Sequence, residues 1–167
     1  MQFQFYKGEK MSVTKVKNYL AQFGADGRVL EFDVSSATVD LAAVAVGVEP
    51  GRIAKTLSFK VKDQNKAILI VAAGDVKIDG AKFKQYFGYK SKMLMPEEVE
   101  QYTGYQIGGV CPFDNPDETD VYLDESLKRF TTVFPACGSS NSAIELSLDE
   151  LWQFSKAKAW TDACRPK

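Results

Sequence analysis

The chain has 167 residues, 45% of them hydrophobic and 26% charged, and this composition suits one hydrophobic core, so we expect a single domain spanning 1–167. The net charge of −1 excludes a general attraction to nucleic acid, so RNA binding would need a local basic patch. There is no histidine, which excludes Ser-His-Asp and Cys-His nucleophiles and histidine general base catalysis. Any hydrolysis must rely on lysine, carboxylates, hydroxyls, backbone groups or the substrate itself.

Capping and turn signals divide the chain into helix-like and strand-like segments. Helices are expected over 13–23, 38–47, 81–88, 96–104 and 148–155, with Ser12 capping the first and Ser36 or Thr38 the second. Strands are expected over 28–32, 53–61, 66–73, 105–113, 121–127, 130–136 and 142–148. The polar turn KDQN predicts a hairpin between the second and third strands. These segments predict an α+β fold with a mixed, largely antiparallel sheet surrounded by helices.

The cysteines and the apolar runs indicate the compartment. Cys111, Cys137 and Cys164 are odd in number and widely spaced, which argues against a disulfide framework or a CxxC metal site and suits a reducing compartment. The longest apolar run, 68–73, is far shorter than the roughly 20 residues that span a bilayer. The first residues do not have the pattern of a signal peptide. We expect a cytoplasmic protein without membrane association, metal or cofactor.

Three motifs occur in a recognisable order: IAKTLSF (53–59), TGYQIGGVCPF (103–113) and CGSSNSAIEL (137–146). Together they resemble the YbaK/ProX family, the bacterial aminoacyl-tRNA deacylases related to the editing domain of prolyl-tRNA synthetases. The resemblance covers most of the chain and implies a barrel-like sheet. It also implies that the partner and substrate is aminoacyl-tRNA carrying the wrong amino acid on its terminal adenosine, and that the reaction is removal of that amino acid.

The same resemblance implies a set of site residues. Lys55 becomes the functional lysine, a cation that holds the terminal phosphate or ribose, and Gly108 begins a GxxxP loop in which backbone N–H groups hold developing negative charge. The attacking group is a water held by the loop, or a hydroxyl or thiol of the substrate. The residues implied to bind the substrate are Gly109, Val110, Cys111, Pro112, Gly138, Ser139 and Asn141.

Simpler structural explanations stay open for each of these residues. A strand lysine such as Lys55 is most often solvated, and paired glycines most often mark a bulge or a tight contact. Cys111 has no histidine to activate it, so we favour a small core residue over a nucleophile. The run 138–141 consists of turn-forming residue types in any case.

The identity of the amino acid is open. Cysteine-specific family members carry a serine and an aspartate around the last glycine loop, where Ala136 and Ala143 stand here, and their early tyrosine has no clear equivalent near Val34 or Ser35. Cysteine recognition is therefore in doubt. The expected substrate is a small aminoacyl group of the Ala, Ser, Thr or Cys class, within which one methylene is worth only about 1–3 kcal/mol.

Two basic stretches are candidates for RNA contact. One is KFKQYFGYKSK (82–92), with Lys82, Lys84, Lys90 and Lys92 among aromatics; the other is Lys7, Lys10, Lys15 and Lys17. We favour a solvated helix whose aromatics face the core, and a synthetase that delivers the tRNA would compensate for weak binding. Two other functions remain: a non-catalytic module that binds tRNA ends, nucleotides or a synthetase, and hydrolysis of another small acyl ester. The sequence specifies no oligomeric state.

Overall fold

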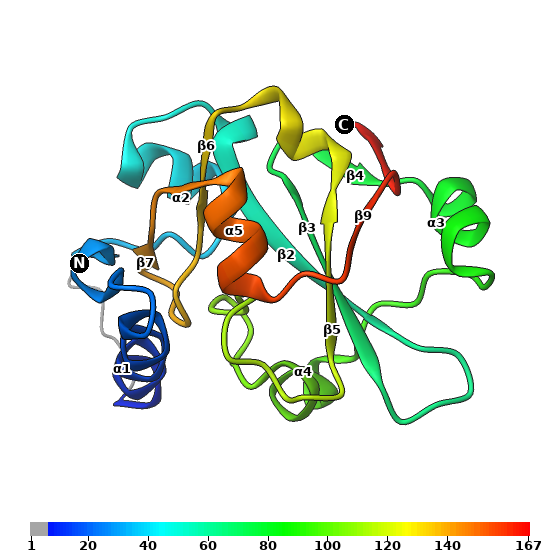
Figure 1. Ribbon diagram of the computed structural model, residues 1–167, viewed down its shortest axis with the longest axis horizontal. Coiled ribbons are helices and arrows are strands. Elements are labelled where there is room, and N and C mark those ends of the chain that lie inside the picture. The colour runs from blue at the N-terminus through cyan, green and yellow to red at the C-terminus, as the bar shows by residue number, and fades with distance from the viewer. Residues whose placement is uncertain (1–6) are drawn as a thin grey trace.

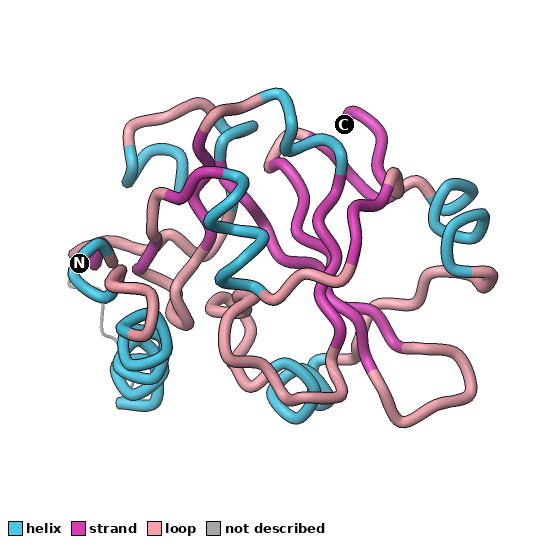
Figure 2. The backbone as a smooth tube through the Cα atoms, viewed as in Figure 1, coloured by secondary structure: helices cyan, strands magenta, loops and turns pink. Residues whose placement is uncertain are grey.

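A computed structural model describes residues 7–167 of the protein (Figure 1). A six-stranded mixed sheet forms the centre, with strand order β8-β6-β2-β3-β5-β9. Its strands are β2 (Ile53–Lys60), β3 (Ala67–Ala73), β5 (Asp120–Asp124), β6 (Thr132–Pro135), β8 (Leu146–Ser147) and β9 (Ala159–Thr161). Figure 2 shows these strands crossing the middle of the molecule between peripheral helices. The α+β fold expected from the sequence is confirmed.

The hairpin of β2 and β3 forms the two central strands of the sheet. Its antiparallel register runs from Ala54 opposite Ala73 to Lys60 opposite Ala67, as the KDQN turn predicts. β3 is buried along its whole length, because it lies in the middle of the sheet and both of its faces are covered. The pairs β2–β6, β3–β5 and β5–β9 are parallel.

The helices cover both faces of this sheet. They are α1 (Lys7–Ala21), α2 (Val39–Val46), α3 (Gly80–Phe87), α4 (Pro96–Thr103) and α5 (Leu148–Ser155). On one face Leu151 of α5 packs with Leu69 and Leu123, and on the other Phe83 of α3 packs with Phe59. Within residues 7–167 no helix has the length and apolar character needed to cross a membrane.

The capping signals expected for the second helix are confirmed. The Thr38 hydroxyl accepts from the N–H of Leu41 at the start of α2, and Gly47 ends that helix with φ 81°. Ser147 and Glu150 form a capping box at the start of α5. The expected cap at Ser12 is wrong: α1 already begins at Lys7, because Glu9, Lys10 and Met11 are good helix formers that carry the helix back past Ser12.

Several expected strands differ in the structure. The segment 105–113 is an irregular loop and not a strand, since Gly108 adopts φ +93°, which no strand accepts. The segment 28–32 is a 3₁₀ turn (Asp26–Arg28) followed by the two-residue β1 (Leu30–Glu31), which pairs with β7 (Ser142–Ala143). A further unexpected pair joins β4 (Val76–Ile78) to β10 (Cys164–Pro166).

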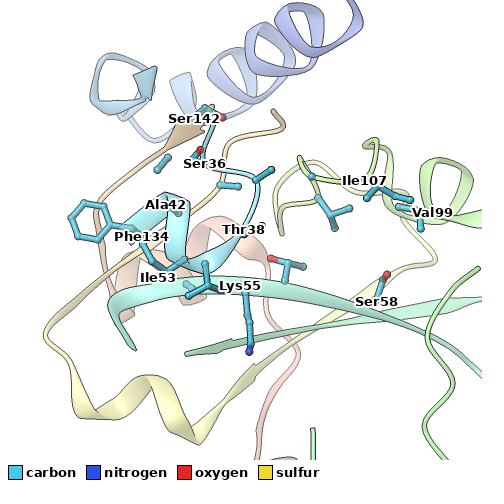
Figure 3. A pocket seen from close by; sticks show the side chains of 18 of the residues that line it. Ser36, Thr38, Ala42, Ile53, Lys55, Ser58, Val99, Ile107, Phe134 and Ser142 are labelled. Atoms are coloured by element: carbon cyan, nitrogen blue, oxygen red, sulfur yellow. The ribbon is translucent and has the colours of Figure 1, made fainter. Parts of the chain in front are cut away.

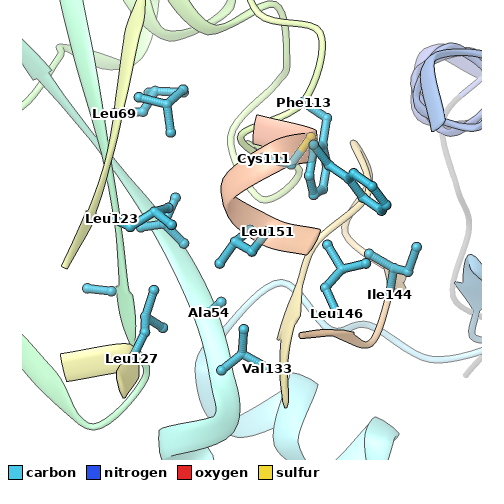
Figure 4. Close-up of a cluster of buried hydrophobic side chains, with 14 of the residues drawn as sticks. Ala54, Leu69, Cys111, Phe113, Leu123, Leu127, Val133, Ile144, Leu146 and Leu151 are labelled. Carbon is cyan, nitrogen blue, oxygen red and sulfur yellow. The ribbon is translucent and has the colours of Figure 1, made fainter. Parts of the chain in front are cut away.

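The loop 105–113 is anchored in the main core through its buried side chains. Cys111 and Phe113 are fully buried and lie among Leu151, Ile144 and Leu146 (Figure 4). The Tyr105 hydroxyl donates to the carbonyl of Phe113, and Asn115 Nδ2 donates to the carbonyls of Thr103 and Cys111. Both ends of the loop are therefore fixed, and the glycine turn between them lies against Ala37 and Ser140.

Candidate functional site

A cavity of about 320 Å³ lies between β2, the start of α2, the segment before α4 and the glycine loop (Figure 3). Most of its wall is apolar, from side chains that include Val39, Ala42, Ile53, Leu94, Val99, Ile107, Val110 and Phe134. Hydroxyl groups are the main polar groups on the wall, from Ser36, Thr38, Thr56, Ser58 and Ser142. An apolar cavity with a few placed polar groups is the usual form of a small-molecule site.

Two of these hydroxyls have no partner. Within residues 7–167, Ser36 Oγ and Thr56 Oγ1 are the only buried side-chain polar atoms without a hydrogen bond. Leaving such a group unpaired costs about 1–3 kcal/mol, so each one calls for a physical explanation. Both line the same cavity. The cavity is therefore equipped to donate to, or accept from, a polar group of a ligand.

The two adjacent glycines do different things. Gly108, at φ +93°, lines the cavity and presents bare backbone to it. Gly109 is buried, and a Cβ on it would lie 2.6 Å from the carbonyl oxygen of Gly138. Its N–H already donates to the carbonyl of Gln106 at 3.0 Å. Gly109 thus joins two loops, while Ile107, Gly108 and Val110 are the residues of the loop that line the cavity.

Lys55 lies in β2 and forms part of the wall, but its ammonium group lies elsewhere. Its Nζ donates to the carbonyl of Val76 and, at 3.5 Å, to that of Gly74. Figure 3 shows the Lys55 side chain leaving the strand on the side opposite Ser58, as the alternation of side chains along a strand requires. Burial, and to a smaller extent Lys167, lower the pKa of this lysine.

The remaining predicted residues are buried next to the cavity and do not line it. Cys111 is part of the core, and burial raises the pKa of its thiol to about 12, so the thiol is protonated at neutral pH. Pro112 is buried next to it. In the following glycine loop, Ser139 Oγ lies 2.8 Å from both Asn141 Oδ1 and Ser142 Oγ and is hydrogen-bonded to them, and Asn141 Nδ2 donates to the carbonyl of Phe32. Gly138, Ser139 and Asn141 are buried and do not line the cavity.

Ala136 and Ala143, the positions at which the sequence departs from the cysteine-specific pattern, do line the cavity. Sequence reasoning missed most of the rest of the wall: the segment 36–39, Thr56, Ser58 and the segment 93–99. Thr56 and Ser58 carried a readable signal, since they are polar residues at alternate positions of an otherwise apolar strand. The segment 93–99 carried none.

Comparison with known proteins agrees with this geometry. The family model of the aminoacyl-tRNA editing domain matches residues 34–154, which contain the cavity and both glycine loops. The chain belongs to this family. It is 54% identical to the uncharacterized protein YwhH of Bacillus subtilis (strain 168), over 93% of this chain and 98% of that protein.

Other members of the editing-domain family are more distant. The chain is 29% identical to the putative Cys-tRNA(Pro)/Cys-tRNA(Cys) deacylase EbsC of Enterococcus faecalis (strain ATCC 700802 / V583), over 66% of this chain and 67% of that protein. It is 27% identical to the multifunctional Ser/Thr-tRNA deacylase ProXp-y of Escherichia coli (strain K12), over 76% and 78%. The crystal structure of a putative trans-editing enzyme for prolyl tRNA synthetase is similar throughout, with TM-score 0.82, 29% identity and coverage of 97% and 99%.

Proposed function

We propose that this protein is a trans-editing aminoacyl-tRNA deacylase that hydrolyses the ester of a small mischarged amino acid, and that hydroxyl-bearing amino acids are its preferred group. Family membership supports the reaction class. The observation that carries the choice of substrate is the pair of unpartnered hydroxyls, Ser36 and Thr56, on one cavity. In this proposal the protein acts in the cytoplasm, and its partner is aminoacyl-tRNA, either free or delivered by a synthetase.

The size and lining of the cavity support a small aminoacyl group. At about 320 Å³ the cavity is at the low end of the range of roughly 300–1,000 Å³ for ligand sites. Apolar walls discriminate poorly among alanine, serine, threonine and cysteine, because a methylene changes the free energy by only about 1–3 kcal/mol. A site with polar groups that only the correct ligand satisfies discriminates far better. Thr56 and Ser36 supply such groups.

The proposed chemistry needs no histidine. A water molecule, or a nucleophile on the substrate, attacks the ester carbonyl carbon, and the ribose oxygen leaves as a hydroxyl after taking up a proton. When water attacks, the products are the free amino acid and intact tRNA. When a side-chain hydroxyl or thiol of the substrate attacks, the products are intact tRNA and a cyclic ester or thioester, which water then opens to the free amino acid. We assign the developing negative charge to backbone N–H groups of Gly108 and Val110, because both line the cavity while the N–H of Gly109 is engaged with Gln106.

Lys55 keeps the role that the family resemblance implies, binding the terminal phosphate or ribose. In this proposal its ammonium group exchanges the carbonyls of Val76 and Gly74 for oxygen atoms of the bound tRNA. The lysine is half-buried on the strand that forms the cavity wall, and its ammonium group lies on the face of β2 opposite Ser58, so this role requires the terminal nucleotide to extend beyond the cavity to that face.

One observation favours a second function, a non-catalytic module that binds tRNA ends. The ammonium group of Lys55 has protein acceptors and points away from Ser58 on the cavity wall. A binding module would keep the cavity and use the lysine only to hold the turn between β3 and β4. Turnover separates the two functions.

The test is deacylation of purified tRNAs charged with Ala, Ser, Thr, Cys or Pro, by the wild type and by Lys55→Ala. We expect the fastest release for Ser or Thr, dependent on Lys55. Release of Ala alone would contradict the preference for hydroxyl groups and leave the deacylase standing. No release from any tRNA, with the RNA still bound, would establish the binding module instead.

A further inference from the structure

Four lysines line a shallow groove at the end of the β2–β3 hairpin: Lys60, Lys62, Lys90 and Lys92. We propose that these four residues, the hairpin patch, form the docking surface for the phosphates of the tRNA acceptor arm. This inference rests on the proposed function, because it describes where the rest of the substrate lies when its aminoacyl end is in the cavity.

The fold brings the four lysines together from two segments. The N–H of Lys60 donates to the carbonyl of Lys92 at 2.8 Å, and Phe59 forms an antiparallel bridge with Met93. The segment around Lys92 therefore runs alongside the free edge of β2, just before the hairpin loop that projects from the sheet in Figure 1. Sequence alone had grouped Lys90 and Lys92 with the helix that precedes them.

The charges of the hairpin patch are not neutralised. Within residues 7–167 none of the four lysines forms an ion pair, and the groove contains only two acidic residues, Asp63 and Glu98. Lys60 Nζ donates to the carbonyl of Gln64 at 2.6 Å. An exposed group of like charges that the fold leaves unpaired is the footprint of a polyanionic partner.

The other basic stretches are weaker candidates for phosphate binding. On α1, Lys17 pairs with Glu31 at 2.7 Å and Lys15 with Asp114 at 4.0 Å. On α3, Lys82 pairs with Asp162 at 3.1 Å, and Phe83 is buried in the core as we favoured. In the hairpin patch, by contrast, four lysines that form no ion pair within residues 7–167 line one groove.

The groove of the hairpin patch lies next to the cavity, and this position most strongly favours a role in binding the rest of the tRNA. Three chain segments each pass from the cavity wall directly into the groove: Ser58 to Lys60 on β2, Met93 to Lys92, and Val99 to Glu98. Residues two apart on a strand lie on the same face about 7 Å from each other. A tRNA whose aminoacyl group occupies the cavity therefore has its next phosphates within reach of the groove, and lysine ammonium groups are suitable point charges for them.

The experiment compares Lys62→Gln/Lys92→Gln with a matched control, Lys10→Gln/Lys84→Gln. The control also removes two exposed lysines without carboxylate partners in the described part of the chain, but outside the groove. Binding of uncharged tRNA is measured by fluorescence anisotropy at several salt concentrations. Because each phosphate contact contributes about 0.7 to the slope of log K against log salt for single strands, we expect the slope to fall by about 1.4 in the patch variant only. At about 0.1 M salt this corresponds to an affinity loss on the order of tenfold or more.

Two substrates keep this inference separate from the proposed function. On aminoacyl-tRNA the patch variant should show a raised KM with kcat nearly unchanged, whereas on an aminoacylated terminal nucleoside it should equal the wild type. If the wild type hydrolyses neither substrate, the proposed function fails, and the anisotropy still decides whether the patch binds RNA. An unchanged salt slope, an equal loss in the control, or a defect that appears only when a synthetase is present would overturn the inference.

Discussion

Gly109 and Gly138 touch through bare backbone: a Cβ on Gly109 would lie 2.6 Å from the carbonyl oxygen of Gly138. Gly138 itself adopts φ +91°. This contact joins the loop that carries Gly108 to the loop that leads into Ser142, and both of those residues line the cavity. The contact therefore fixes the distance between two parts of the wall.

Replacing Gly109 with alanine should separate these loops. Overpacking of this kind typically costs about 1–3 kcal/mol of stability. We expect Gly109→Ala to lower the melting temperature by several degrees and to reduce deacylation more than the loss of folded protein explains. Gly27→Ala is the control, since its Cβ would meet nothing within 4 Å. Equal behaviour of the two variants in calorimetry and activity assays would refute the role given to the contact.

The unpartnered hydroxyls predict opposite effects on stability and activity. Thr56→Val removes a buried, unpaired hydroxyl at nearly constant shape, so the free protein should become slightly more stable. Deacylation of Ser-tRNA or Thr-tRNA should fall about tenfold, the value of one hydrogen bond of roughly 1.4 kcal/mol, while Ala-tRNA is unaffected. Ser36→Ala should act in the same direction.

Thr131→Val, at an exposed position outside the cavity, is the matched control for Thr56→Val. Melting temperature and kcat/KM on each charged tRNA are the measurements. A uniform loss on all substrates, or loss of stability in Thr56→Val, would show that Thr56 has a structural role and does not select the substrate.

Lys55→Met tests whether the lysine acts on substrate. A hydrogen bond to a charged group contributes about 1.5–3 kcal/mol, so deacylation should fall by roughly 10- to 150-fold if Lys55 binds the phosphate or ribose. The same variant loses the bonds to the carbonyls of Val76 and Gly74 and should melt at a lower temperature. A folded, less stable variant with undiminished activity would assign Lys55 to the turn between β3 and β4 alone.

The ion pair of Arg28 and Glu150 predicts acid sensitivity. The hydrogen bond from Arg28, at 2.5 Å, lowers the pKa of Glu150 from 4.5 to about 2. A lowered carboxyl pKa contributes stability that is fully present above pH 4.5 and is lost as the pH falls toward 2. Urea midpoints between pH 2 and 6 should therefore vary less in Glu150→Gln, which keeps an oxygen acceptor for the N–H of Ser147. The side chains of the pair are 44% and 32% exposed, so the effect should weaken in salt. An unchanged pH profile would contradict the prediction.

Cys111 should be inert in the folded protein. Burial raises the pKa of its thiol to about 12, and Cys137 and Cys164 are buried as well. Thiol titration at neutral pH should detect reactive cysteines only after unfolding, and Cys111→Ala should keep its hydrolytic rate while melting somewhat earlier. Rapid labelling of the native protein with loss of activity would reverse this assignment and make the thiol a nucleophile.

The elements that sequence predicted correctly are those with local signals. Thr38 and Gly47 delimit α2, and Ser147 with Glu150 starts α5, because a cap bonds to backbone groups a few residues away. β4, β9 and β10 were missed because each has three residues, and each exists only through a partner distant in the chain. The loop 105–113 looked like a strand because it is rich in apolar residues, yet its backbone turns at Gly108.

The parts of the candidate site that lie in sequence motifs could be predicted, whereas the parts that depend on strand register and on contacts between distant segments could not. Motifs indicated Lys55, Gly108, Val110 and the alanine positions, all of which line the cavity. The core position of Cys111 agrees with the reading favoured from the absence of histidine, although the family resemblance had implied that it binds substrate. The motifs did not reveal that Lys55 and Thr56 place their side chains on opposite faces of β2. The facing wall from 93 to 99 comes from the bridge between Phe59 and Met93, which no local pattern encodes.

The cavity wall comes from five separate segments, 36–42, 53–58, 93–99, 107–110 and 134–143. The parallel pairing of Ile53 with Phe134 is one of the links that hold them, and pairings so far apart in sequence form late and slowly. A fragment that lacks any one of these segments lacks part of the wall. The cavity therefore forms only when all five segments have come together, so we expect binding of an aminoacyl group to require the complete fold.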